Sequence, residues 1–361
     1  MPLKIIKART LPIGVDLGTT AVRMAQFRVT GDVIELLAAG TAQLGRTKSM
    51  PQRLEAMTNG IRDVFKSNAF KGRQAVLALP AELGVVQHVK LPKMPSAETA
   101  RALAWELQGK LPFAAEDAVI RHVVAGDVFG EGDAQQEIIA VAAERGMLES
   151  FLKMASKAGL VTVGINIDAC AVVECFARLF RRTSDLGRTI LFLDLGAAST
   201  QVVLTHGNNM VFARNLNMGG DNLDQALAEG LKIPIDQARA LRRDPNKAQQ
   251  DTAAEDELYH MLDKPLSALA DELTQCLRYY ESNFRNQSIE RAIFVGGQAY
   301  DKRLCQLLAQ RLNLPAQIGD PLVRVKRVEG AGLDIGLDRR EPQPDWAVAV
   351  GLSLGWHFKA A

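Results

Sequence analysis

The chain has 361 residues, 47% hydrophobic and 23% charged, with 43 Lys and Arg against 41 Asp and Glu. This length predicts two domains or lobes of a globular protein, and a net charge of only +2 excludes a general electrostatic argument for binding nucleic acid or an acidic membrane. Since the sequence has no signal-peptide pattern and no run of ~18 apolar residues, we expect a cytoplasmic protein without a membrane span, whose four cysteines are buried free thiols.

The N-terminal part predicts three strands, a helix and a fourth strand. Strand patterns cover residues 11–16, 21–29 and 33–41, and Thr30-Gly31-Asp32 is a good hairpin turn between the last two. Residues 51–67 show helical spacing of apolar side chains. Residues 74–80 are a short apolar run of the kind buried in a parallel sheet. The order is β-β-β-α-β.

Residues 81–160 differ in character and predict a small α+β module inserted into the first lobe. The expected elements are strands at 85–91, 119–127 and 137–143 and helices at 96–110 and 145–158. A strand at 161–167 and a helix at 168–182, which Asp168 could cap, then resume the first lobe.

The opening pattern returns in the second half of the chain. Leu193-Asp194-Leu195-Gly196-Ala197-Ala198-Ser199-Thr200 repeats the arrangement of Val15-Asp16-Leu17-Gly18-Thr19-Thr20: the end of an apolar strand, Asp-Leu-Gly, then hydroxyl residues. Strands follow each copy. A repeat over so long a distance predicts duplicated lobes and not a solenoid.

The remaining segments predict mostly helices. Gly219-Gly220 opens a helix at 222–231, and Gly296-Gly297 ends a buried strand. The other expected elements are helices at 235–243, 258–286, 301–312 and 346–356, with Pro265 near a start or a kink, and exposed loops at 244–256 and 330–345.

Two facing copies of strand, Asp, Gly and hydroxyl can bind a polyphosphate. Carboxylates on opposite walls can hold a hydrated Mg²⁺, and glycine turns present backbone N–H groups to phosphate oxygens. A Gly-Gly corner at the carboxyl end of a parallel strand is a place where open α/β sheets bind ligands, and a helix start such as Gly219-Gly220 favours negative charge. Taken singly, each Asp could be an ordinary turn carboxylate and each Gly-Gly a tight turn.

These motifs, with Asp168 and the closing helix, resemble the actin-like ATPase superfamily. The inserted module and three strings narrow the resemblance to the PilM family of cytoplasmic type IV pilus assembly proteins. The strings are Lys110-Leu111-Pro112-Phe113, Met218-Gly219-Gly220 and Arg278-Tyr279-Tyr280 with Phe294-Val295-Gly296-Gly297. The resemblance implies an α/β fold of duplicated actin-like, ribonuclease-H-like lobes. The first lobe would comprise 1–80, 161–187 and the returning helix 345–358, the partner-binding module 81–160, and the second lobe 188–344.

The resemblance also implies site residues for ATP or ADP and Mg²⁺. The first phosphate loop would contain Asp16, Gly18, Thr19 and Thr20, and the second Asp194, Gly196, Ser199 and Thr200. The nucleoside would be flanked by Gly219, Gly220, Gly296, Gly297 and Gln298. Asp16 and Asp194 would hold Mg²⁺ through water. Thr19-Thr20 and Arg23 stand where the family usually has serines and a lysine. Asp168 is the candidate for orienting water in a weak ATPase reaction, and a plain N-cap is the other interpretation.

The function implied by the resemblance is nucleotide-dependent assembly at the inner-membrane platform of the type IV pilus, and hence a role in bacterial motility. The partner would be the N-terminal cytoplasmic tail of a PilN-like membrane protein, bound beside the module, with other platform or motor proteins besides. The protein would be attached to the inner membrane through these partners.

Two alternatives belong to the same superfamily. An FtsA-like division protein would end in a basic amphipathic membrane helix, a pattern that residues 346–358 lack. A small-molecule kinase needs a catalytic carboxylate in a substrate pocket, and residues 42–80 offer only Glu55 and Asp63 on a surface-looking helix.

Overall fold

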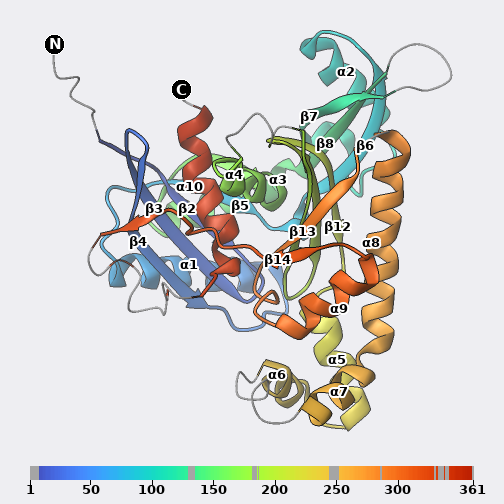
Figure 1. The fold of residues 1–361 in the computed structure, drawn as a ribbon. Helices are drawn as coiled ribbons and strands as arrows, with labels where there is room; N and C mark the ends of the chain where they lie inside the picture. Colours follow the sequence, from blue (N-terminus) through green and yellow to red (C-terminus); the bar gives the residue numbers. More distant parts are fainter. Residues whose placement is uncertain are drawn as a thin grey trace, which may run out of the picture.

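The computed structural model describes residues 8–128, 135–180, 185, 187–243, 252–284, 287–328, 331, 337 and 341–359. Two lobes, each built on its own sheet, lie next to each other, and a smaller third sheet lies beside the second lobe at the end of the long helix α8 (Figure 1). This is the duplicated α/β fold that the repeat predicts.

A seven-stranded sheet forms the first lobe. Its order is β15-β4-β3-β2-β5-β9, and β1 pairs with β3 off this path. The strands are β1 Arg9–Thr10, β2 Ile13–Leu17, β3 Ala21–Thr30, β4 Val33–Gln43, β5 Gln74–Leu79, β9 Val161–Ile167 and β15 Lys326–Arg327. The strands that the sequence predicts here are confirmed, since their apolar runs are buried in the sheet; the short pieces β1 and β15 are additional.

The second lobe repeats this order strand for strand. Its sheet is β12-β11-β10-β13-β14, so an antiparallel meander of three strands is again followed by parallel strands. The strands are β10 Thr189–Leu195, β11 Thr200–His206, β12 Asn209–Leu216, β13 Ile289–Val295 and β14 Ala316–Ile318. The Asp-Leu-Gly motifs end the equivalent strands β2 and β10.

Helices cover these sheets. They are α1 Met50–Ser67, α2 Ser96–Glu106, α3 Arg145–Lys157, α4 Asp168–Ala177, α5 Gly220–Leu231, α6 Ile235–Arg243, α7 Thr252–Met261, α8 Asp263–Asn283, α9 Lys302–Leu312 and α10 Ala347–Lys359. In α1, Met57, Ile61 and Val64 are buried, as their helical spacing predicts. Short 3₁₀ turns occupy Ala81–Leu83, Ala115–Asp117 and Pro344–Trp346.

The predicted inserted module is built on an antiparallel sheet of β6 Val85–Pro92, β8 Gln135–Glu144 and β7 Ala118–Val128, in that order. Helix α2 packs on one face of this sheet. Helix α3 packs elsewhere: Phe151 and Met154 are buried in the core that β2 and α1 build in the first lobe. By its packing, therefore, α3 belongs to the first lobe although residue 160 is the predicted end of the module.

One loop prediction is partly wrong. Residues 252–256 are the first part of α7 and not part of an exposed loop, because the run Thr-Ala-Ala-Glu-Asp-Glu is polar yet rich in good helix formers. Residues 244–251 lie outside the described residues. The long helix predicted at 258–286 is two helices that meet at Leu262, with Pro265 in the first turn of α8, where its missing N–H is harmless. Most of the predicted loop 330–345 lies outside the described residues.

Candidate functional site

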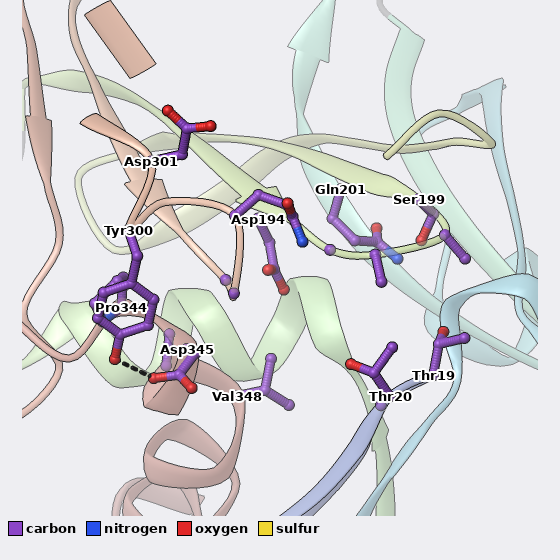
Figure 2. A pocket seen from close by; sticks show the side chains of 18 of the residues that line it. Thr19, Thr20, Asp194, Ser199, Gln201, Tyr300, Asp301, Pro344, Asp345 and Val348 are labelled. Carbon is purple, nitrogen blue, oxygen red and sulfur yellow. Dashed lines mark hydrogen bonds between the residues drawn. The ribbon is translucent and has the colours of Figure 1, made fainter. Parts of the chain in front are cut away.

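The turn between β2 and β3 and the turn between β10 and β11 border one cavity of about 730 Å³. Figure 2 shows Thr19 and Thr20 on one side and Ser199 and Gln201 on the other, with Asp194 directed into the space between them. Most of the site residues predicted from the sequence line this cavity: Asp16, Gly18, Thr19, Thr20, Asp168, Asp194, Gly196, Ser199, Gly296, Gly297 and Gln298.

The two turns have the same geometry. Each joins two antiparallel strands, whose last paired residues are Leu17 with Val22 and Leu195 with Thr200. A Cβ on Gly18 would lie 2.9 Å from the carbonyl oxygen of Ala21, and one on Gly196 would lie 2.8 Å from that of Ser199. Both turns therefore need glycine at the same place, because any side chain would collide with the backbone of the turn.

The sequence predicts Gly219 and Gly220 as residues that flank the nucleoside, but they are not among the residues that line the cavity. They lie behind the second turn and support it. The carbonyls of Gly196 and Ala197 accept hydrogen bonds from the N–H groups of Gly220 and Asp221, at 3.1 and 2.8 Å. In a trans peptide the carbonyl and the next N–H point in opposite directions, so the N–H groups of Ala197 and Ala198 face away from these contacts. A Cβ on Gly219 would lie 2.6 Å from the Ala197 carbonyl oxygen, which explains its glycine.

Thr200 also lies outside the cavity lining, although the sequence predicts it there. It is only 1% exposed, and its hydroxyl donates to the carbonyl of Met218 at 2.7 Å. As the first residue of β11, its side chain is directed behind the turn. Of the hydroxyls in the second motif, Ser199 alone therefore lines the cavity.

Three of the carboxylates that line this cavity have raised pKa values. Burial raises the pKa of Asp16 to about 7, against the lowering effect of Arg23 and with a further rise from the charges of Asp194 and Asp345. Burial raises the pKa of Asp194 to about 6, again opposed by Arg23. The pKa of Asp168 is raised well above its ordinary value by burial and then by the charges of Asp16, Asp194 and Glu82. The cavity thus has an excess of negative charge that a cation would relieve.

Asp168 lines the cavity from the start of α4. The N-cap of α4 is Ile167, and no side-chain hydrogen bond caps this helix. The interpretation of Asp168 as a plain N-cap is therefore wrong, because it is the first helical residue and not the residue before it. Its position leaves the side chain available to a ligand in the cavity.

Two cavity residues at equivalent positions were not assigned from the sequence. Arg23 pairs across the strands with Asp16, and Gln201 pairs with Asp194 in the same way. Arg23 Nη1 lies 3.8 Å from Asp16 Oδ2. Gln201 is 6% exposed, and within the described residues its buried Oε1 has no hydrogen-bond partner. The repeat itself could have identified both, because the register of a two-strand hairpin places them beside the aspartates.

Asp345 lines the cavity and bonds to one side chain from each lobe. Its Oδ2 accepts from Arg23 Nη2 at 2.7 Å and from Arg23 Nε at 2.8 Å, and its Oδ1 accepts from the Tyr300 hydroxyl at 2.7 Å (Figure 2). Sequence reasoning missed this residue because it follows a loop without periodic signal. Arg23 is consequently held in place by a carboxylate other than Asp16.

The Gly296-Gly297 corner forms another wall. Gly296 has φ +85°, and a Cβ there would lie 2.2 Å from Asp194 Oδ1, so glycine gives the aspartate its space. A Cβ on Gly297 would meet nothing within 4 Å. Gln298 is held by Arg242, whose Nη2 donates to its Oε1 at 2.7 Å and whose own side chain is 1% exposed. This corner gives a ligand close access to the backbone.

Comparison with known proteins identifies the family and agrees with the fold. The family described as "Type IV pilus assembly protein PilM" matches residues 14–356. The chain belongs to this family. A solved chain of a "PilM-PilN type IV pilus biogenesis complex" superposes with a TM-score of 0.79 at 22% identity, over 95% of this chain and 98% of that one.

More distant relatives share the fold. The ethanolamine utilization protein EutJ from Carboxydothermus hydrogenoformans has a TM-score of 0.55 at 14% identity over 98% of this chain and 90% of that one. MreB 5 of Spiroplasma citri, solved with AMPPNP, has a TM-score of 0.52 at 12% identity over 99% and 98%. The cell division protein FtsA of Bacillus subtilis is 19% identical over 70% of this chain and 61% of its own length, so the chain spans less than two thirds of that relative.

Proposed function

We propose that the chain binds ATP or ADP with Mg²⁺ in the cavity and acts as an assembly protein of the type IV pilus inner-membrane platform. In this proposal the nucleotide state is coupled to binding of the N-terminal cytoplasmic tail of a PilN-like membrane protein. One observation carries the nucleotide part: two matching Asp-Leu-Gly turns, one from each lobe, border the same cavity. Family membership supports the pilus part.

The residues at the cavity fit a magnesium polyphosphate. Asp16 and Asp194 have raised pKa values, about 7 and about 6, so negative charge on these carboxylates is unfavourable in the empty cavity and a divalent cation would relieve it. Arg23 lies next to Asp16 and offers a guanidinium to phosphate oxygens. We expect Mg²⁺ to be held through water, with the turns supplying backbone N–H groups to the phosphates.

Hydrolysis needs a group that orients water in line with the terminal phosphate. Asp168 is the proposed residue, and the Gln201 amide, whose Oε1 is unpartnered in the described part of the chain, is a second polar group of the lining. We expect slow turnover. Loss of hydrolysis with retained binding in Asp168→Asn would support the assignment of Asp168.

The partner part of the proposal rests on the family and on the related solved complex, in which a PilM chain is bound to PilN. The module also exposes apolar side chains: Trp105 and Val124 are 73% and 45% exposed, and Val161 of the adjoining β9 is 56% exposed. Such side chains suit an apolar peptide. In the described residues no helix is long and apolar enough to cross a membrane, so we propose attachment to the inner membrane through PilN-like and other platform partners.

Calorimetric titration with Mg²⁺-ATP tests the site. We expect Asp16→Ala and Asp194→Ala each to weaken nucleotide binding about tenfold or more, because residues that hold a metal through water typically contribute that much. Asp63→Ala, which removes an exposed aspartate on α1, is the matched control and should bind as the wild type does. Unchanged affinity in both cavity variants would refute the site assignment.

A synthetic PilN-type tail peptide tests the coupling. Its affinity for the wild type should differ between nucleotide-free and Mg²⁺-ATP-saturated protein, and this difference should vanish in Asp194→Ala. The distant FtsA match favours a filament-forming division protein as the alternative. Sedimentation with ATP and lipid vesicles, in the absence of any partner, would favour that alternative. Transfer of phosphate to small alcohols or acids at ordinary enzyme rates would instead indicate a kinase.

A further inference from the structure

The module sheet, β6, β7 and β8, uses its two faces differently. Side chains alternate along β8, so Ile138 and Ala140 share one face while Glu137 and Ile139 share the other. The first face packs against α2 and forms a small core with Leu103. Ile139, on the second face, belongs to the large core that includes the strands of the second lobe.

The second face of the module sheet lies on the second lobe. All three of its strands contact β12, and the sheet is seen at the upper end of α8 (Figure 1). A Cβ built on Gly126 of β7 would come within 3.1 Å of the Phe284 ring, which follows the last residue of α8. The sheet that is inserted between two strands of the first lobe is thus packed on the second lobe.

A polar cluster around the buried Glu137 joins the two surfaces. His88 Nδ1 of β6 lies 2.8 Å from Glu137 Oε1, and the Tyr279 hydroxyl of α8 donates to the same oxygen at 2.7 Å. His88 Nε2 lies 3.0 Å from the carbonyl oxygen of Ala213 in β12. Because Nδ1 faces a carboxylate, which can only accept, this ring nitrogen donates to Glu137.

Packing surrounds this cluster. The His88 ring stacks on Phe212 with 4.7 Å between centroids and meets the edge of Tyr279 at 5.3 Å. Glu137 has no exposed surface, and its Oε2 has no hydrogen-bond partner among the described residues. Losing either donor while the two surfaces stay packed would therefore leave a buried carboxylate short of a partner, which is a costly state.

The segments that lead into and out of the module sheet have further partners in the first lobe. Glu82, in the 3₁₀ turn before β6, pairs with Arg53 of α1. Helix α3, directly after β8, packs on α1 and β9. Pro80, Ala81 and Glu82 also line the cavity between the two turns. The chain therefore changes its packing partner at residues 80–84 and at the junction of β8 and α3.

We propose that the module sheet is fixed to the second lobe by the cluster of His88, Glu137 and Tyr279 and moves with that lobe, turning on residues 80–84 and 144–145 when the lobes reorient. The module is then an extension of the second lobe in its motion, although its sequence lies within the first. This inference does not depend on which ligand fills the cavity.

Distances between spin labels test the proposal on the full chain without any ligand. With Cys170→Ser to remove the half-buried thiol, one label is placed at Ala100 of α2 in the module and the second either at Gln310 of α9 or at Asn59 of α1, all exposed positions. We expect a narrower distance distribution for module to second lobe than for module to first lobe. A module-to-second-lobe distribution as broad as the other, or broader, would overturn the proposal.

Variants of the cluster complete the test. Tyr279→Phe and Glu137→Gln should broaden the module-to-second-lobe distribution and raise amide exchange in β6, β8 and β12. The matched control is His122→Gln, which replaces a histidine opposite Ala140 and hence on the α2 face of the same sheet, and should change neither. Tyr279→Phe removes a single hydroxyl, so it keeps the test valid if Glu137→Gln unfolds. Unchanged distance distributions in the two cluster variants, or equal broadening in His122→Gln, would refute the role of the cluster.

Discussion

At the scale of single residues, the two glycines of the Gly296-Gly297 corner have different roles. Gly296 is required by conformation and by space: its φ is +85°, and a Cβ would lie 2.2 Å from Asp194 Oδ1. Gly297 has ordinary backbone geometry and open space around it, and it lines the cavity. Of these two adjacent glycines, Gly296 is therefore required for stability, and Gly297 leaves room for a ligand at the backbone.

This difference predicts opposite outcomes for two alanine variants. Gly296→Ala should lower the free energy of unfolding by on the order of 2 kcal/mol, because it adds strain and displaces Asp194. Gly297→Ala should leave urea unfolding unchanged but weaken nucleotide binding, because its methyl group points into the cavity. The same loss of stability in both variants would show that the corner tolerates no side chain at all.

At the scale of elements, α10 closes the first lobe by close backbone approach. It lies against β2 and α4. A Cβ on Gly14 of β2 would lie 2.0 Å from the carbonyl oxygen of Ala349, and one on Gly351 would lie 1.8 Å from that of Ala171. The Ser353 hydroxyl donates to the carbonyl of Pro12 at 2.7 Å. These contacts fix the helix that directly follows the 3₁₀ turn of Asp345, the residue that holds Arg23 at the cavity.

Two helical glycines test this packing. Gly351→Ala should lower the free energy of unfolding by about 3 kcal/mol, because the methyl group meets the backbone of α4 and the helices must separate. Gly146→Ala, in α3, meets nothing within 4 Å and should raise the free energy of unfolding by about 0.5 kcal/mol through helix propensity. Chemical denaturation of both variants measures the contrast, and equal effects would contradict the close approach of α10 and α4.

At the scale of the whole molecule, the module sheet belongs to the first lobe by its place in the sequence but to the second lobe by its packing. The module sheet is inserted between β5 and β9 of the first lobe, yet its strands lie on β12 of the second. At the contact, burial tends to raise the pKa of Glu137, but hydrogen bonds from His88 and Tyr279 and the charges of His88 and Lys90 lower it overall. The ionised carboxylate is thus part of what holds the two bodies together.

The lowered pKa predicts how stability depends on pH. A carboxyl with a lower pKa in the folded than in the unfolded state stabilises the fold above its unfolded value, here 4.5, and loses this contribution as pH falls through the folded value. Glu137→Gln should therefore lower the free energy of unfolding by on the order of 2 kcal/mol at pH 7, and the difference should shrink below the unfolded value. A difference between variant and wild type that is independent of pH would contradict this role.

Much of the fold follows from local signals. The repeat of Asp16-Leu17-Gly18 at Asp194-Leu195-Gly196 predicted two equivalent lobes, and strand periodicity located nearly all strands. Gly219, Gly220 and Thr200 have residue types that suit a ligand site, but they do not line the cavity because their contacts are to the backbone behind the second turn. Asp345 and Tyr300 lack any pattern in the sequence, and only their meeting at Arg23 makes them part of the cavity.

The sequence by itself determined the duplicated α/β lobes, the two turns and the family, because alternation of apolar residues and glycine at sharp turns are local requirements written into neighbouring positions. Only the tertiary structure decided that Arg23 is held by Asp345, that Gln201 faces the cavity, and that the module sheet is packed on the second lobe through His88, Glu137 and Tyr279. These contacts join residues far apart in the chain, and burial with pairing of polar groups, not local propensity, selects them.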